Sequence, residues 1–198
     1  LRSRIFYADN DNGNDQSNKT NVYLAEYRFN REIISLGRLN VTSGAYFQQS
    51  FSQASLYAGS GSNKNTLENY AAFIQLEKKL IKKLLVSAGF RAEYFEMNNK
   101  DAQLEPILRA GLNYQLTEGT FIRCSYGQGY RYPTIAEKFI ETGAGGISVF
   151  PNPEVRPESS WNAEAGIKQG FKIGNFFGFA DIAVFEQRYH NTIEYIYA

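Results

Sequence analysis

Few side chains in this sequence could carry acid–base, nucleophilic or metal chemistry. Four carboxylates cluster around one expected connection, and paired acids can share a proton or bind calcium: Glu93, Glu96, Asp101 and Glu105. The sequence has one histidine, His190, and one cysteine, Cys124. A His-rich metal site, a zinc cluster and an internal disulfide framework therefore cannot be built, and a catalytic triad would depend on His190. We interpret the carboxylates as a solvated charged patch and predict no enzyme activity, no catalytic residue, no metal site and no cofactor.

Nucleotide and nucleic-acid binding are also disfavoured. The glycines within residues 127–129 and 142–147 lack the strand-to-helix context of a phosphate-binding loop. The formal net charge of +1 argues against a general polyanion binder. No nucleic-acid partner is therefore predicted.

The elements that must position any site follow from a regular alternation of side chains. In LLVSAGFRAEYF, residues 84–95, apolar side chains share one parity, and small or charged side chains share the other: Ser87, Gly89, Arg91 and Glu93. This pattern predicts a strand with one apolar and one polar face. Similar alternation predicts nine strands, with a tenth starting near 193: 1–8, 21–29, 34–50, 67–78, 84–96, 104–116, 120–130, 160–170 and 176–189.

A helix is the alternative for residues 67–83, whose charges and leucine spacing fit either element. The apolar parity favours a strand there: Tyr70, Ala72, Ile74 and Leu76. No apolar run approaches the roughly 18 residues of a membrane-spanning helix.

The connections between the predicted strands alternate between long and short. Residues 9–20, 51–66 and 131–159 are long, and 98–103 is intermediate; residues 30–33 (NREI), 79–83, 117–119 and 171–175 are short. A meander with long connections on one side and tight turns on the other has two unequal rims, which is typical of outer-membrane barrels. A soluble sandwich has no physical reason to sort its loops in this way.

Strand length favours the same architecture. Several predicted strands reach about a dozen residues, whereas soluble strands average about five or six and a bilayer needs roughly 9 to 11. Aromatic residues lie toward strand ends, where a membrane girdle would sit: Tyr94, Tyr114, Tyr126 and Trp161. The sequence therefore predicts an all-β fold, an antiparallel transmembrane β-barrel meander whose apolar parity faces lipid and whose polar parity faces the lumen.

The C-terminal half carries motifs that resemble the barrel domain of TonB-dependent outer-membrane receptors. They are G-Y-R-x-P-x-x-x-E (Gly129 to Glu137), N-P-x-x-x-P-E (Asn152 to Glu158) and E-x-G-x-K (Glu164 to Lys168), followed by an A-V-F-x-x-R-Y strand. By motif the resemblance covers about residues 104–198, and before that it consists of the rhythm of strands and loops.

The resemblance implies a plugged barrel of about 22 strands, of which this chain would supply about 9 or 10. It implies an active-transport receptor in the outer membrane of a Gram-negative bacterium, energised through TonB, for a scarce nutrient such as siderophore-bound iron, cobalamin, haem or a glycan. The implied partners are the lipid bilayer, the receptor's own plug domain, TonB and a small-molecule or metal-chelate ligand. Because the sequence begins and ends inside predicted strands, we expect residues 1–198 to be a fragment of the barrel domain, without the plug.

Two sets of site residues follow from this interpretation. Ligand contact is expected in the loops at 51–66 and 131–159, from Arg131, Tyr132, Glu137, Phe139, Phe150, Asn152, Arg156 and Glu158. For four of these residues, charge pairs that brace the loop are the structural alternative: Arg131, Glu137, Arg156 and Glu158. Lumen or plug contact is expected from inward polar residues: Arg38, Gln75, Arg91, Glu93 and Arg109.

Several alternatives remain open from the sequence. A passive porin or an outer-membrane adhesin would share the strand pattern without a plug. A barrel-rim hydrolase would need a convergent catalytic set, and a soluble carbohydrate-binding sandwich would need no amphiphile. The lysines at 78, 79, 82 and 83 flank a short turn and fit either a solvated hairpin or contact with anionic headgroups.

Overall fold

The chain forms one long antiparallel sheet whose neighbouring strands also follow each other in sequence, apart from a small hairpin outside it. In this computed structural model, residues 2–11, 17–144 and 146–194 are described. The sheet has nine strands in the order β1-β2-β3-β4-β5-β6-β7-β10-β11. Their bounds are β1 Arg2–Asp11, β2 Ser17–Ile33, β3 Leu39–Ala54, β4 Lys64–Ile81, β5 Leu84–Met97, β6 Lys100–Gln115, β7 Thr120–Arg131, β10 Glu158–Ile173 and β11 Phe176–His190.

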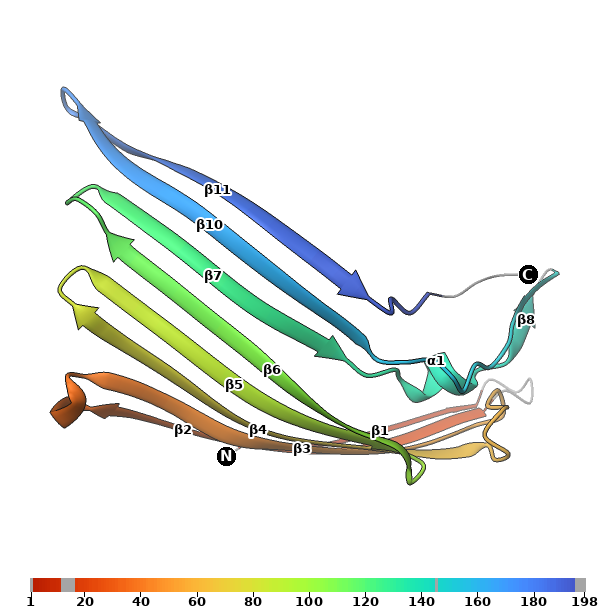
Figure 1. Cartoon of the computed structure of the whole chain (residues 1–198). Helices are drawn as coiled ribbons and strands as arrows, with labels where there is room; N and C mark the ends of the chain where they lie inside the picture. Colours follow the sequence, from red (N-terminus) through yellow and green to blue (C-terminus); the bar gives the residue numbers. More distant parts are fainter. Residues whose placement is uncertain (1, 12–16, 145, 195–198) are drawn as a thin grey trace.

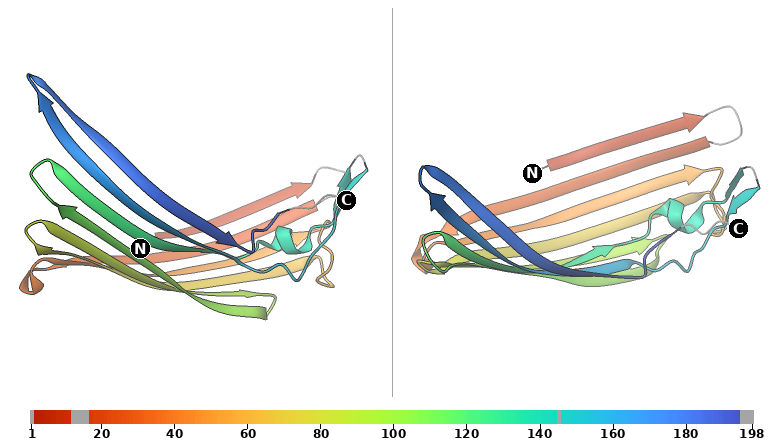
Figure 2. Two further views of the ribbon diagram at one scale, coloured as in Figure 1. Left: turned by 45° about the horizontal axis from the view of Figure 1, so that its top comes forward. Right: turned by 90° about the horizontal axis from the view of Figure 1, so that it is seen from above.

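The sheet is curved and open, with β1 and β11 at its two free edges (Figure 1). The strands run side by side along a trough (Figure 2), because the right-handed twist of each strand accumulates across the sheet. The prediction of an all-β antiparallel meander of about nine strands is therefore confirmed, and residues 67–83 form strand β4 rather than a helix. No strand is present at 191–194, and the rest of the predicted tenth strand lies outside the described residues.

The two rims of the sheet differ, although the rim with the long connections also carries the tight turn between β5 and β6. We call the rim with the tight connections the short-turn rim; it carries η1 (Ile34–Leu36) and the turns at 82–83, 116–119 and 174–175. We call the opposite rim the long-loop rim; its largest connection, residues 132–157, contains α1 (Ile135–Phe139) and a small hairpin of β8 (Thr142–Ala144) and β9 (Ile147–Val149). The described helices are too short or too polar to cross a membrane.

Three predicted connections were misplaced or too long. Of the long connection expected at 9–20, residues 9–11 belong to β1 and residues 17–20 belong to β2. The turn expected at 30–33 lies at 34–38, because β2 continues to Ile33 and the chain reverses through η1, which Gly37 closes with a left-handed φ of 72°. The connection expected at 98–103 is a tight turn of Asn98 and Asn99, both at positive φ, so β6 already begins at Lys100. Asparagine tolerates the left-handed region, and two such residues match the twist of a two-residue hairpin.

The two faces of the sheet separate apolar from polar side chains. The convex face exposes large apolar residues from most of the nine strands, among them Tyr27, Ile74, Phe90, Leu108, Ile167 and Ile182. The concave face carries polar residues over most of its length and a small buried apolar cluster near the long-loop rim. In a soluble protein the apolar face would be buried, so an exposed apolar face of this extent requires an apolar surrounding.

Candidate functional site

The connection at 132–157 folds back over the concave face. Its helix α1 begins with a capping box, in which Thr134 Oγ1 accepts from the Glu137 backbone N–H while Glu137 accepts from the Thr134 N–H. Two side chains of α1, Ile135 and Phe139, are buried against residues of β4 and β5: Leu67, Phe95 and Met97. This contact fixes the helix on the inner wall of the sheet, and we call the helix with its flanking loop the docked loop (residues 132–157).

An aromatic stack strengthens the docking. The rings of Tyr132 and Phe95 lie parallel, with centroids 4.7 Å apart and an interplanar angle of 13°. Burial raises the pKa of the Tyr132 phenol to about 12, so the phenol is neutral at physiological pH. Such a pair contributes about 0.5–1.5 kcal/mol beyond the area that it buries.

The docked loop also pairs with the β3–β4 connection (residues 55–63). The backbone N–H of Ala58 donates to the carbonyl of Phe139 at 2.7 Å, and that of Glu141 donates to Leu56 at 2.8 Å. Gly59 lies against Pro151, where an added Cβ would be 3.0 Å from the Pro151 Cβ, and its φ of 78° favours glycine. The two longest described connections of the long-loop rim therefore support each other.

A charge network holds the ends of the docked loop together. The guanidinium of Arg131 donates to Glu137 through Nη1 at 2.9 Å and to Glu158 through Nε at 2.7 Å. Burial opposes ionisation of Glu137, yet its pKa is lowered, because the backbone N–H and hydroxyl of Thr134 and the Arg131 guanidinium all donate to the carboxylate. Of the charge pairs proposed to brace this loop, those of Arg131 with Glu137 and Glu158 are present.

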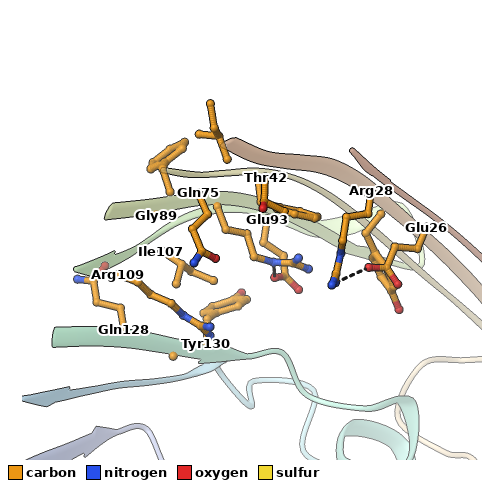
Figure 3. A pocket seen from close by; sticks show the side chains of 16 residues that line it. Glu26, Arg28, Thr42, Gln75, Gly89, Glu93, Ile107, Arg109, Gln128 and Tyr130 are labelled. Atoms are coloured by element: carbon orange, nitrogen blue, oxygen red, sulfur yellow. Dashed lines mark hydrogen bonds and ion pairs between the residues drawn. The ribbon is translucent and has the colours of Figure 1, made fainter. Parts of the chain in front are cut away.

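A pocket of about 460 Å³ occupies the middle of the concave face (Figure 3). Its walls come from strands β2 to β7, and its lining combines charged, amide and aromatic side chains, including Glu26, Arg28, Tyr46, Gln75, Arg91, Glu93, Arg109 and Tyr130. We call it the concave pocket. Its polar lining, opposite the apolar convex face, gives this wall an inner surface suited to water or to polar protein surface.

Ion pairs and hydrogen bonds orient the side chains of the concave pocket. Arg91 Nε donates to Glu93 at 2.7 Å, and Arg28 donates to Glu26 at 2.9 Å. Asn69, which is buried, donates to the other oxygen of Glu93 at 3.0 Å. Within the described parts of the chain, Arg109 has no carboxylate within ion-pair distance, so the pocket presents a positive charge that a partner group could neutralise.

The pocket extends to a seam between β6 and β7. These strands pair from Gln115 to Arg109 and then separate. The next backbone N–H, of Leu108, donates instead to the side-chain carbonyl of Gln128 at 2.8 Å. Pro106 lies two residues further along this unpaired stretch. Proline has no backbone N–H, and here its absence removes no hydrogen bond between β6 and β7. Among the described residues the buried hydroxyl of Tyr130, beside this seam, has no hydrogen-bond partner.

The structure distributes the predicted ligand residues over two environments. Arg131, Glu137 and Glu158 meet in the charge network, while Tyr132 and Phe139 pack beneath the docked loop. The others lie on its outer surface: Phe150, Asn152 and Arg156. Asn152 Oδ1 accepts from the backbone N–H of Glu154 at 3.1 Å, and among the described residues Arg156 has no ion-pair partner.

Most of the predicted lumen residues lie close together. Gln75, Arg91, Glu93 and Arg109 all line the concave pocket. Arg38 does not: it lies in the short turn after η1, at φ 59°, with Glu32 at 3.9 Å. Its placement in a strand from 34 to 50 was wrong, because the chain reverses there.

Sequence reasoning missed part of the pocket lining. Glu26 and Arg28 stand on the polar parity of β2 and could have been selected by that parity. Tyr46 and Tyr130 carry no such signal, since a tyrosine suits both faces of a barrel strand. In the described residues, no group of three histidine, cysteine or acidic side chains could hold a metal ion.

Comparison with known protein families identifies the family of this chain. A family model described as TonB dependent receptor-like, beta-barrel, matches residues 2–198. This chain belongs to that family. Members are transport receptors rather than enzymes, and they are outer-membrane proteins of Gram-negative bacteria. The resemblance inferred from the motifs of the C-terminal half is confirmed and extends over the N-terminal half. Comparison with individual curated proteins gives no match.

Solved structures of receptors share this fold at low sequence identity. The siderophore receptor PirA from Pseudomonas aeruginosa is 16% identical with a TM-score of 0.75, over 94% of this chain and 34% of that one. The ferric enterobactin receptor PfeA from the same organism, as a mutant, is 15% identical with a TM-score of 0.69, over 87% and 27%. The Serratia marcescens haemophore receptor HasR, in complex with HasA and haem, is 15% identical with a TM-score of 0.65, over 87% and 34%. The chain thus spans about a third of the length of the receptors that it matches, so a TonB-dependent barrel contains more wall than these nine strands.

Proposed function

We propose that residues 1–198 are part of the barrel wall of an outer-membrane receptor that imports a scarce nutrient with energy supplied through TonB. The observation that carries the proposal is the concave pocket, a polar inner wall with an uncompensated Arg109, behind an apolar convex face. A passive channel needs a wet lumen, whereas a plugged barrel also needs polar groups that a plug surface can pair with. The family to which the chain belongs supports the plugged form.

The plug domain, the TonB-contact segment and the remaining strands belong to the parts of the receptor outside this chain, in this proposal. The concave pocket then faces the plug, with Gln75, Arg91, Glu93 and Arg109 as contact residues. Arg38 is not included, because it lies in a turn at the rim.

The ligand class that we propose is a metal chelate, of the ferric siderophore or haem type. Three of the solved proteins that share this fold are described as receptors for siderophores or for a haem-carrying protein, which supports this choice over cobalamin or a glycan. Contact residues are proposed among the exposed side chains of the docked loop: Phe150, Asn152 and Arg156. The buried positions of Tyr132 and Phe139 favour a structural role for these two.

Uptake by intact cells tests the proposal. A strain that lacks its other iron receptors and expresses the complete receptor should accumulate radiolabelled iron from a ferric siderophore or haem, and accumulation should stop when TonB is deleted. Uptake of a small sugar should be unchanged by TonB deletion. Iron or sugar entry through this protein without TonB would instead identify a passive porin and overturn the proposal.

A further inference from the structure

The short-turn rim carries a group of cations on two neighbouring turns. Lys82 and Lys83 form the β4–β5 turn, Lys78 and Lys79 precede it on β4, and Arg38 lies in the β2–β3 turn. With Arg31 near the end of β2 they form what we call the basic rim: Arg31, Arg38, Lys78, Lys79, Lys82 and Lys83.

Contacts between successive turns hold these cations close together. Lys78 lies against the β2–β3 turn, because a Cβ placed on Gly37 would be 3.7 Å from the ammonium nitrogen of Lys78. Gly37 directly precedes Arg38 in the chain. Lys83 reaches the following turn, where its ammonium donates to the carbonyl of Leu116 at 3.5 Å. The positive charges therefore extend across three consecutive turns.

Acidic side chains do not neutralise the basic rim. Glu32 lies 3.9 Å from Arg38, and the side chains of this pair are 48% and 81% exposed, so the pair contributes little. In the described ranges, no other member of the basic rim has a carboxylate within ion-pair distance. A cluster of unpaired cations on adjacent turns repels itself and is stabilised by a multivalent anion.

The position of the basic rim relative to the apolar convex face identifies the kind of anion. On β4 the outward residues Ile74 and Leu76 are followed by Lys78, and on β2 the outward residue Phe29 is followed by Arg31. Large apolar side chains are exposed between the cations: Ile34, Leu36, Leu80 and Ile81. Cations that begin where the lipid-facing residues end, mixed with exposed aliphatic side chains, lie at the level of headgroups and upper acyl chains.

We propose that the basic rim binds the headgroups of anionic phospholipids in the leaflet that faces the periplasm. The short turns are on the periplasmic side of an outer-membrane barrel, and the phosphodiester of such a lipid offers the negative charge while its acyl chains cover the exposed aliphatic residues. The inference rests on the membrane placement in the proposed function, but not on the ligand or on TonB.

Lipid binding to the purified complete receptor tests this proposal. The receptor in a nonionic detergent is titrated with phosphatidylglycerol, and bound lipid is counted by native mass spectrometry. The triple variant Lys78→Gln, Lys82→Gln, Lys83→Gln should weaken binding on the order of 100-fold, since each cation near an anionic surface contributes about fivefold. Phosphatidylcholine should bind more weakly to the wild type and be unaffected by the substitutions.

A matched control makes the same charge change at the opposite rim. Lys19, Lys64 and Lys100 are exposed near the long loops, and their replacement by Gln should leave phosphatidylglycerol binding unchanged. Equal loss in both triple variants would mean that net charge alone attracts the lipid, and no loss in either would mean that the basic rim does not bind it. Displacement of the lipid by millimolar inorganic phosphate would indicate a site for free anions; each of these results overturns the proposal. Heat-dependent migration in gels verifies that each variant is a folded barrel, and TonB-dependent uptake, measured separately, distinguishes failure of this proposal from failure of the proposed function.

Discussion

Strand β5 carries two phenylalanines five residues apart that meet opposite environments. Phe90 projects from the convex face and is 45% exposed, while Phe95 projects from the concave face and is 2% exposed beneath the docked loop. The two side chains are identical, and their parity alone separates them. Between its rims the convex face is mainly apolar and exposed, whereas the concave face buries apolar side chains where a loop of the same chain covers them.

The comparison shows that exposure has different meanings on the two faces. In the proposed membrane placement, an exposed apolar residue on the convex face needs no partner from the protein, because hydrocarbon would surround it. On the concave face, which meets polar surroundings, an apolar residue requires cover. Phe95 and Met97 have that cover because Tyr132, Ile135 and Phe139 lie over them.

The largest effect is expected from removing the apolar contact under the docked loop. Phe95→Ala should destabilise docking of residues 132–157 by about 3–5 kcal/mol, since it leaves a cavity and removes the stack with Tyr132. Amide hydrogen exchange of residues 135–149 should rise strongly in the complete receptor. Phe90→Ala on the convex face should leave that exchange unchanged, and an equal rise in both variants would refute the distinction between the faces.

An arginine introduced on each face should also distinguish the two faces, with a somewhat smaller effect on stability. Ala110 is exposed on the convex face, so Ala110→Arg should cost about 2–4 kcal/mol if it lies near the bilayer midplane. Gly89→Arg is the matched change on the concave face, where an added Cβ would meet its nearest neighbour, Arg109, at 3.7 Å. Folding of the receptor into lipid vesicles, followed by urea titration, should show the larger loss for Ala110→Arg; similar losses would contradict the assigned orientation.

The charge network should contribute about 1 kcal/mol to loop docking, because the Arg131 side chain is 43% exposed and solvent screens its ion pairs. Arg131→Gln should therefore raise exchange of α1 modestly. A double-mutant cycle with Glu137→Gln isolates the pair, and a coupling of zero would show that the network adds nothing to the apolar contact.

Acidification should weaken docking by a still smaller amount. The pKa of Glu137 is lowered from its ordinary value of 4.5 when the loop is docked, so its contribution is present above that pH and declines as the pH falls below it. Exchange of α1, corrected for its intrinsic pH dependence, should rise below pH 4.5. The rise should be smaller in Glu137→Gln, and identical profiles would remove Glu137 as a cause.

Most of the sheet could be predicted from the sequence, because each strand repeats the same two-residue alternation over 10 to 18 residues. The turns could not be predicted as well. A strand end at Ile33 and a turn at Asn98–Asn99 depend on left-handed backbone at one or two positions, and the flanking alternation does not mark those positions. The two asparagines were the available signal.

The docked loop was the least predictable part. Its length and prolines were visible, but its helix and its hairpin at 142–149 depend on contacts with β4, β5 and the β3–β4 connection. Residues 142–147 are rich in glycine and carry few side chains that could fix their shape, so the sequence did not indicate that Thr142–Ala144 and Ile147–Val149 pair. Tyr132 and Phe139 were selected as ligand contacts from their apolar character, which equally suits the buried positions that they occupy.

Because β6 separates from β7 beyond Arg109, the two parts of the sheet on either side of this seam are joined differently at the two rims. Toward the short turns, each neighbouring pair of strands from β2 to β11 is joined by backbone pairing, with one register shift between Lys79 and Ile81. Above Arg109 the first six strands and the last three are joined by the amide of Gln128, by the packing of Tyr130 and by the docked loop, which follows β7 and packs on β4 and β5. Separation of the two groups of strands at the long-loop rim would therefore require the docked loop to leave β4 and β5, while the pairing near the short turns could stay intact.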